Sequence, residues 1–157
     1  MKIWILHDSQ LGNGKLIAET MQKVLESSAE VHVGHVKQVD PKRVADERPD
    51  VVIIGAAIRA FSTSLSSKNW IKRFKSQIND LNYVVPYGAV FLTHALPKKI
   101  ANIWGKRYHK AIQGSEFAKI HPEWLSGWVN GQNPPPPKPG VLEFFESYAK
   151  SIPESIE

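Results

Sequence analysis

Two patterns of apolar and polar positions alternate along the chain. Short, nearly continuous apolar runs rich in Val and Ile predict strands buried on both faces, and we expect these strands at residues 2–7, 30–36, 50–55, 82–92 and 123–129. Between them, apolar residues recur at helical spacing, which predicts helices at residues 15–27, 41–48, 66–78, 98–113 and 141–152. Regular alternation of the two element types indicates an α/β protein whose parallel sheet carries helices on both faces.

Five strands joined by crossover helices fit a three-layer, doubly wound parallel sheet with strand order 2-1-3-4-5. In that order, the ligand crevice lies at the carboxyl ends of the first and third strands. The 157 residues are enough for a single domain with a sizeable core. We interpret the proline run at 134–137 as a stiff loop within that domain.

Composition narrows the functional classes. No stretch approaches the roughly 20 apolar residues that span a bilayer, and the N-terminus lacks the layout of a signal peptide. We therefore expect a soluble, cytoplasmic protein. The chain has no cysteine, which excludes disulfides, thiolate catalysis and cysteine-ligated clusters, so redox chemistry would require a bound cofactor.

The turn after the first predicted strand carries the clearest chemical signal. Residues 8–15 read Asp-Ser-Gln-Leu-Gly-Asn-Gly-Lys and lead into a helix, whose first N–H groups and positive dipole end favour an anion such as phosphate. The spacing excludes a P-loop. That motif requires glycine at position 9 and Ser or Thr at position 16, and the chain has Ser9 and Leu16 there. A dinucleotide fingerprint is disfavoured because Ile17 stands at its third small residue.

A monophosphate loop of the form Ser-x-x-Gly-Asn-Gly remains. Here the chain resembles the flavodoxin family, whose first loop has the pattern Ser/Thr-x-Thr-Gly-Asn-Thr and wraps the phosphate of FMN. Ser9, Gly12 and Asn13 match this pattern, and Ala18, four residues beyond it, also matches the family. Leu11 and Gly14 stand where the family usually has threonines. The same turn can form without any ligand, because glycine supplies a positive φ and the helix needs a cap.

Two further loops fall at the same predicted edge of the sheet. In flavodoxins, loops after the third and fourth strands sandwich the isoalloxazine ring, so the resemblance covers nearly the whole chain and implies a flavodoxin-like fold with FMN as cofactor. It implies phosphate contacts from Ser9, Gln10, Leu11, Gly12, Asn13, Gly14 and Lys15, and ring contacts from Ala56, Ala57, Ile58, Arg59, Ala60, Phe61, Thr93, His94, Ala95 and Leu96. Phe61 and His94 are the candidates for stacking on the ring.

The loop after the third strand points to a narrower relationship. Residues 55–59 read Gly-Ala-Ala-Ile-Arg, which is similar to a Gly-Ala-Ser-Ile-Arg stretch in the menaquinone-dependent protoporphyrinogen dehydrogenase branch of the fold. Other chemistry has little support. Gly55 follows Ile54 where a receiver domain would need Asp, the histidines lack metal-ligand spacing, and Ser9 and Ser62 lie outside a Gly-x-Ser-x-Gly elbow.

Charge separates this chain from typical flavodoxins, which are acidic. It has 20 Lys and Arg against 15 Asp and Glu, a formal net charge of +5. Basic residues gather on the third and fourth predicted helices: Lys68, Lys72, Arg73, Lys75, Lys98, Lys99, Lys106, Arg107 and Lys110. One interpretation is an ordinary solvated surface. The other is a docking face for an acidic redox partner protein, an anionic small-molecule acceptor or the surface of an anionic membrane.

We expect no nucleic-acid partner, because the basic residues lack a recognised motif or interleaved exposed aromatics. The sequence therefore predicts an FMN-binding protein in electron transfer. Two alternatives stay open. One is an FMN-dependent oxidoreductase linked to a quinone or a porphyrinogen, and the other is a flavin-free regulatory or binding domain of the same fold.

Overall fold

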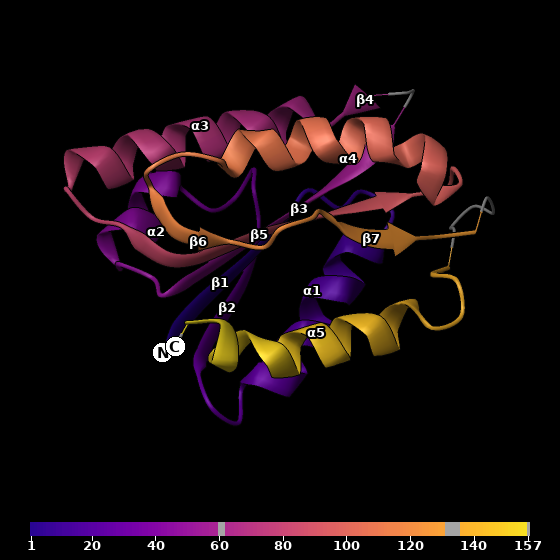
Figure 1. The fold of residues 1–157 in the computed structure, drawn as a ribbon, viewed down its shortest axis with the longest axis horizontal. Coiled ribbons are helices and arrows are strands. Elements are labelled where there is room, and N and C mark those ends of the chain that lie inside the picture. Colours follow the sequence, from indigo (N-terminus) through magenta and orange to yellow (C-terminus); the bar gives the residue numbers. More distant parts are fainter. Residues whose placement is uncertain (60–61, 131–135, 157) are drawn as a thin grey trace.

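A parallel sheet with helices on both faces makes up the part of the chain that the computed structural model describes, residues 1–59, 62–130 and 136–156 (Figure 1). Its elements in chain order are β1 (Lys2–His7), α1 (Asn13–Leu25), β2 (Glu30–His35), α2 (Pro41–Asp46), β3 (Val51–Arg59), β4 (Ser62–Thr63), α3 (Leu65–Asp80), β5 (Val85–His94), α4 (Lys98–Ile112), β6 (Phe117–Ile120), β7 (Leu125–Trp128) and α5 (Val141–Ile156). None of the helices in these ranges is long and apolar enough to cross a membrane.

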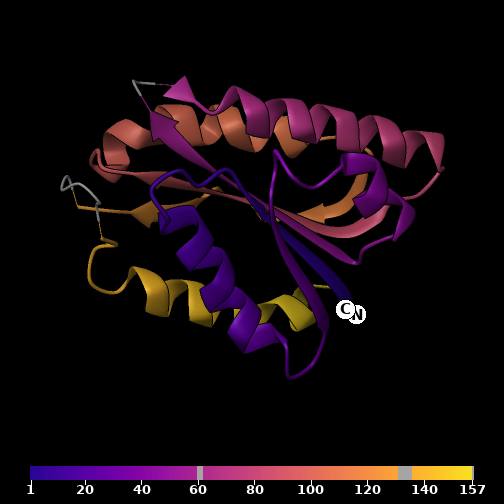
Figure 2. The same ribbon diagram turned by 180° about the vertical axis from the view of Figure 1, so that it is seen from behind.

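The strands follow the order β2-β1-β3-β5-β6, and the pairs along this path are parallel. Because β5 is the fourth main strand and β6 occupies the fifth position, the predicted doubly wound order is confirmed. Strand β7 pairs with the carboxyl half of β5, from Phe91 opposite Leu125 to His94 opposite Trp128. The carboxyl ends of β1, β3 and β5 therefore lie at one edge of the sheet, and the start of β1 lies at the opposite edge (Figures 1 and 2).

The fifth position differs from the expectation. The sequence predicts a single strand at 123–129, whereas two short strands, β6 and β7, share that position along β5. Pro122 lies in the break between them, and proline cannot donate a ladder hydrogen bond. Strand β3 is also longer than predicted, because its end pairs with the two residues of β4 in an antiparallel ladder.

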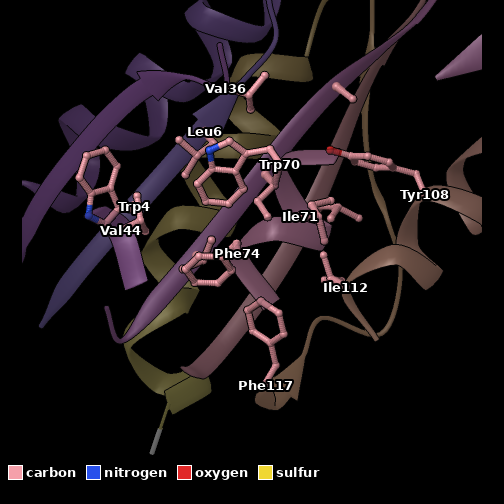
Figure 3. Close-up of a cluster of buried hydrophobic side chains, with 14 of the residues drawn as sticks. Trp4, Leu6, Val36, Val44, Trp70, Ile71, Phe74, Tyr108, Ile112 and Phe117 are labelled. Carbon is pink, nitrogen blue, oxygen red and sulfur yellow. The ribbon is translucent and has the colours of Figure 1, made fainter. Parts of the chain in front are cut away.

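Alternating side chains of the strands divide the core into two layers. Trp4 and Leu6 of β1 pack with α2, α3 and α4, whereas Ile3 and Ile5 pack with α1 and α5. This period of two is expected of strands covered on both faces. Figure 3 shows the first layer, which collects these aromatic and aliphatic side chains over the sheet: Trp70, Ile71, Phe74, Tyr108, Ile112 and Phe117.

Two of the long helices bury one face against the sheet. The apolar spacing of residues 66–78 predicts four core positions on α3, and all four are buried: Trp70, Ile71, Phe74 and Ile78. On α1, the buried stripe consists of Ile17, Ala18, Met21 and Leu25. The apolar spacing of residues 15–27 also predicts a buried Leu16, but that prediction is wrong: Leu16 is 39% exposed, because it lies about 180° around the helix from Leu25.

Candidate functional site

Three loops converge on one hollow at the carboxyl edge of the sheet, which we name the strand-end pocket. Its volume is about 190 Å³, and its lining consists of Ser9, Gln10, Leu11, Asn13, Gly14, Ala57, Ile58, Arg59, Thr93, His94, Ala95 and Val129. Every one of these except Val129 is a predicted site residue. The doubly wound topology brings the segments together, because the carboxyl ends of β1, β3 and β5 are neighbours.

The loop between β1 and α1 is shaped by a glycine and a serine. Gly12 is the N-cap residue of α1 and lies in the left-handed region, with φ 97° and ψ −14°. The Gly12 N–H donates to Ser9 Oγ at 2.9 Å, and its carbonyl accepts from the Leu16 N–H at 2.9 Å. The helix therefore brings its first N–H groups and the positive end of its dipole to the pocket wall at Asn13 and Gly14.

His7 supports this loop from below. Its side chain is 5% exposed, and its Nδ1 accepts a hydrogen bond from the Ser9 N–H at 3.2 Å. Burial lowers the pKa of His7 to about 4, and the nearby charges of His35 and Lys15 contribute to this lowering. The ring is consequently neutral near pH 7, as an accepting Nδ1 requires. Sequence reasoning took His7 only as the end of a strand and missed this role.

An ion pair between the buried Asp8 and the partly exposed Arg59 joins the ends of β1 and β3. Arg59 reaches across to Asp8: its Nη2 donates to the Asp8 carbonyl oxygen at 3.0 Å, and its Nη1 lies 3.7 Å from Asp8 Oδ2. Asp8 is 4% exposed, and burial raises the pKa of its carboxyl group, against the lowering effects of a Ser64 hydrogen bond and the Arg59 charge. The pair fixes a partly exposed guanidinium group in the pocket wall.

Asp8 is not among the predicted site residues. Its signal in the sequence is a charged residue directly after an apolar run. In the described part of the chain, its Oδ2 has no hydrogen-bond partner, although it lies near the Arg59 charge. An unsatisfied buried carboxylate oxygen is costly, so the contact with Arg59 matters for keeping this edge of the sheet in place.

His94 ties the loop after β5 to β7. Its Nδ1 lies 2.7 Å from the Leu96 carbonyl oxygen and its Nε2 2.7 Å from Ser126 Oγ. Because a carbonyl only accepts, Nδ1 carries the proton and Nε2 accepts from the Ser126 hydroxyl. Burial lowers the pKa of His94, which favours this neutral form. The histidine thereby fixes the wall of the pocket.

The same contacts bear on the predicted stacking role of His94. Its ring is 1% exposed and lies nearly parallel to Trp128, with centroids 6.2 Å apart and planes at 15°. It also meets Trp124 edge to face, at a centroid distance of 5.5 Å. His94 would have to leave this position to present a ring face to a planar ligand. Stacking by His94 therefore stays a prediction.

Several predicted residues lie outside the strand-end pocket. Ala56 is 2% exposed and belongs to the core beneath it, because the pleat of β3 turns its side chain toward the helices. Gly12 and Lys15 line an adjoining hollow on the β2 side, and Lys15 Nζ lies 3.8 Å from Glu19. Leu96 contributes its carbonyl to His94. Ala60 and Phe61 lie outside the described residues.

Comparison with known proteins identifies the relatives of this chain. A sequence model described as a flavodoxin domain matches residues 4–119. A search of curated protein sequences finds no match. Among solved structures, oxidised flavodoxin 2 from Bacillus cereus is similar with a TM-score of 0.74 and 15% identity, over 98% of this chain and 99% of that one. Oxidised flavodoxin 1 from the same organism has a TM-score of 0.70 and 16% identity, over 98% of each chain.

A longer protein shares the fold as well. Rubredoxin oxygen:oxidoreductase from the anaerobe Desulfovibrio gigas has a TM-score of 0.76 and 14% identity, over 99% of this chain. The present chain spans only 36% of that protein's length. These structural likenesses agree with the strand order and the layered architecture described above. Together with the sequence match over residues 4–119, they show that the chain belongs to the flavodoxin domain family.

Proposed function

We propose that this protein binds FMN in the strand-end pocket and uses it to transfer electrons. The observation that carries the proposal is the convergence on one hollow of three separate segments, each at the place in the chain where flavodoxins have a cofactor loop. Membership in the flavodoxin domain family supports it, as do two similar structures described as oxidised flavodoxins.

The loop before α1 fits a phosphate group. Gly12 has no Cβ atom and lies in the left-handed region, so the backbone can turn its N–H groups toward one point. Ser9 Oγ accepts from the Gly12 N–H, which leaves the serine hydroxyl proton available as a donor. The start of α1 adds a favourable dipole for an anion. Ser9, Asn13 and Gly14 would therefore hold the phosphate.

The remaining walls fit one side of a planar ring. Ala57, Ile58 and Ala95 supply small or apolar surface, and Thr93 is 8% exposed beside them. A volume of about 190 Å³ is less than the roughly 300 Å³ at which ligand pockets usually begin. A bound flavin would thus keep part of its ring at the surface. That arrangement suits exchange of electrons with a docked partner.

Bound FMN would supply one- and two-electron redox chemistry, while the chain supplies binding and electrostatics. Arg59 places a positive charge in the pocket wall and favours a ligand that gains negative charge. Asp8 holds that guanidinium group in place through its backbone carbonyl and its buried carboxylate. His94 keeps the opposite wall closed through its bond to Ser126.

Titration of the apoprotein with FMN and with riboflavin tests the proposal. Riboflavin has the same ring and lacks the phosphate, so the difference in affinity isolates the loop before α1. We expect FMN to bind at least 100-fold more tightly and its fluorescence to be quenched. Protein that takes up no FMN would overturn the proposal and leave a flavin-free regulatory or binding domain. Equal affinity for the two flavins would place the phosphate elsewhere.

An FMN-dependent oxidoreductase is the second candidate, and the similarity of residues 55–59 to a dehydrogenase branch of the fold favours it. Arg59 of that stretch lies in the pocket wall, where it would also meet an anionic substrate. Anaerobic mixing of the FMN-loaded protein with NAD(P)H, a quinol or a porphyrinogen separates the two candidates. Rapid reduction with repeated turnover indicates an enzyme, whereas slow reduction by all three donors supports a carrier.

A further inference from the structure

A second, larger hollow runs along α4 and is separate from the strand-end pocket. It has a volume of about 700 Å³, and we name it the α4 groove. Its lining consists of Lys98, Lys99, Asn102, Lys106, His109, Lys110, Gln113, Pro122, Glu123 and Trp124. The sequence predicts a cluster of lysines on this helix. It does not predict the groove, which also needs the break between β6 and β7. Four lysines and a single carboxylate make its lining strongly basic.

The lysines of the α4 groove differ from two basic residues of α3 on the same face of the sheet. On α3, Arg73 lies 3.6 Å from Asp40, and Lys75 lies 3.3 Å from Glu116. Among residues 1–59, 62–130 and 136–156, no ion pair joins a lysine of the groove to a carboxylate. Their charge is therefore available to a ligand from outside the chain.

The floor of the groove is fixed rather than adaptable. Trp124 is 5% exposed, and its Nε1 donates to Asn102 Oδ1 at 2.8 Å. The indole lies directly on the backbone of α4, because a Cβ atom at Gly105 would come within 2.1 Å of its Cε2. Trp124 is the last residue of the break between β6 and β7, and it packs on α4. The lysines of α4 therefore line a hollow with a rigid floor.

The groove begins next to the strand-end pocket. Lys98 opens α4 just after the loop of residues 94–97, and that loop contains two residues of the pocket lining, His94 and Ala95. Trp124, on the floor of the groove, touches His94 edge to face. A ligand seated in the groove therefore lies beside the proposed flavin site. The 15 residues of α4 make a helix about 22 Å long, and six or seven residues of an extended chain would span the same distance.

We propose that the α4 groove binds an extended acidic segment of the protein that exchanges electrons with the strand-end pocket. This inference rests on the proposed function for its redox role. Charge complementarity selects the occupant, since four unpaired lysines in a concave site attract carboxylates along a chain. Single-stranded nucleic acid fits less well, because the buried Trp124 offers no ring face on which bases could stack. A membrane surface is flat and would contact protruding lysines better than those of a groove.

Binding of a fluorescein-labelled octaglutamate peptide to the FMN-loaded protein tests this inference by fluorescence anisotropy. The groove variant carries Lys98→Gln, Lys99→Gln, Lys106→Gln and Lys110→Gln. The control variant carries Lys23→Gln, Lys37→Gln, Lys68→Gln and Lys72→Gln, which gives it the same net charge. We expect the groove variant to bind the peptide at least tenfold more weakly than the wild type and the control variant less than twofold more weakly.

Two results would overturn the inference. Equal losses in both variants would show that only net charge matters, and tighter binding of oligothymidylate or of phosphatidylserine vesicles through the same four lysines would assign another occupant. FMN uptake, measured by absorbance in the same samples, tests the strand-end pocket separately. Loss of peptide binding with retained FMN, or the reverse, thus shows which of the two proposals fails. Thermal melting of both variants confirms that they are folded.

Discussion

The strand-end pocket and the α4 groove lie side by side but are built in opposite ways. The pocket takes most of its lining from three loops far apart in the sequence, and many of its lining residues are small. The groove takes most of its lining from a single helix, and long basic side chains dominate it. The pocket is also less than a third of the volume of the groove, about 190 Å³ against about 700 Å³.

The binding groups of the pocket come from the backbone fold, whereas those of the groove come from individual side chains. Backbone N–H groups and a helix dipole at the pocket follow from the topology, and few substitutions could remove them. The charge of the groove depends on individual lysines, each of which a single substitution removes without strain. We therefore expect the cofactor site to depend on backbone geometry and the partner site on charge. Substitutions confined to one site or the other can test that separation.

The largest expected effect comes from Gly12→Val. A β-branched residue at φ 97° costs about 1–2 kcal/mol of backbone strain, and the distorted loop would lose phosphate hydrogen bonds worth a further ~1.5–3 kcal/mol. FMN should bind roughly 100-fold more weakly, as measured by fluorescence titration. Peptide binding in the α4 groove should not change.

Gly140→Val is the matched control for this strain. Gly140 also has a positive φ, 86°, and a Cβ atom added there would meet nothing within 4 Å, as at Gly12. It lies before α5 and outside the strand-end pocket. Both variants should lose similar unfolding free energy in urea, and only Gly12→Val should lose FMN affinity. Equal FMN losses would mean that general destabilisation, and not the loop, accounts for the effect.

Gly105→Ala should damage the groove while sparing the pocket. The added methyl group would lie 2.1 Å from Trp124, so the indole has to move off the helix. Such overpacking costs typically 1–3 kcal/mol, and we expect a loss of about 2 kcal/mol in the free energy of unfolding. Peptide affinity should fall with the displaced floor, and FMN affinity should stay within a factor of two. An unchanged tryptophan fluorescence spectrum would contradict this.

Acid should act on the pocket through His7. Its folded pKa of about 4 lies below the ordinary value near 6.5, so between these values the unfolded chain binds a proton that the folded chain does not. Stability consequently falls as the pH drops through this window. In urea unfolding, the wild type should lose about 1.5 kcal/mol more than His7→Asn between pH 7 and pH 5. Asparagine retains an acceptor near the Ser9 N–H, and identical losses would contradict the assignment.

Much of the fold could be predicted from the sequence because its strands are nearly continuous apolar runs. Ile53 and Ile54 are buried on opposite faces of the sheet, a pattern that only a central strand requires. The split fifth strand was missed, because its edge position leaves a weak pattern and the effect of Pro122 depends on tertiary pairing. Similarly, the pocket followed from loop motifs, whereas Asp8 and His7 support it through contacts that no local pattern encodes.

The smallest expected effect is a gain in FMN affinity from Gly14→Thr. Gly14 stands where flavodoxins usually have a threonine, and it lines the pocket at the start of α1. A Cβ atom there would lie 3.4 Å from Ser9 Cβ and 3.7 Å from His7 Cβ, which is ordinary contact. Gly14→Thr should therefore be accommodated and add one hydroxyl donor toward the phosphate. We expect FMN to bind up to tenfold more tightly, about 1.4 kcal/mol, with riboflavin affinity unchanged.

Gly14→Val is the control, because valine matches the shape of threonine and lacks its hydroxyl group. Both substitutions reduce the flexibility of the unfolded chain to a similar extent, so any shared gain in stability reports backbone entropy alone. Only a difference between the two in FMN affinity reports a new hydrogen bond. If threonine and valine gave the same affinity, the phosphate would not lie at the start of α1, and the convergence of the three loops would have to serve another ligand.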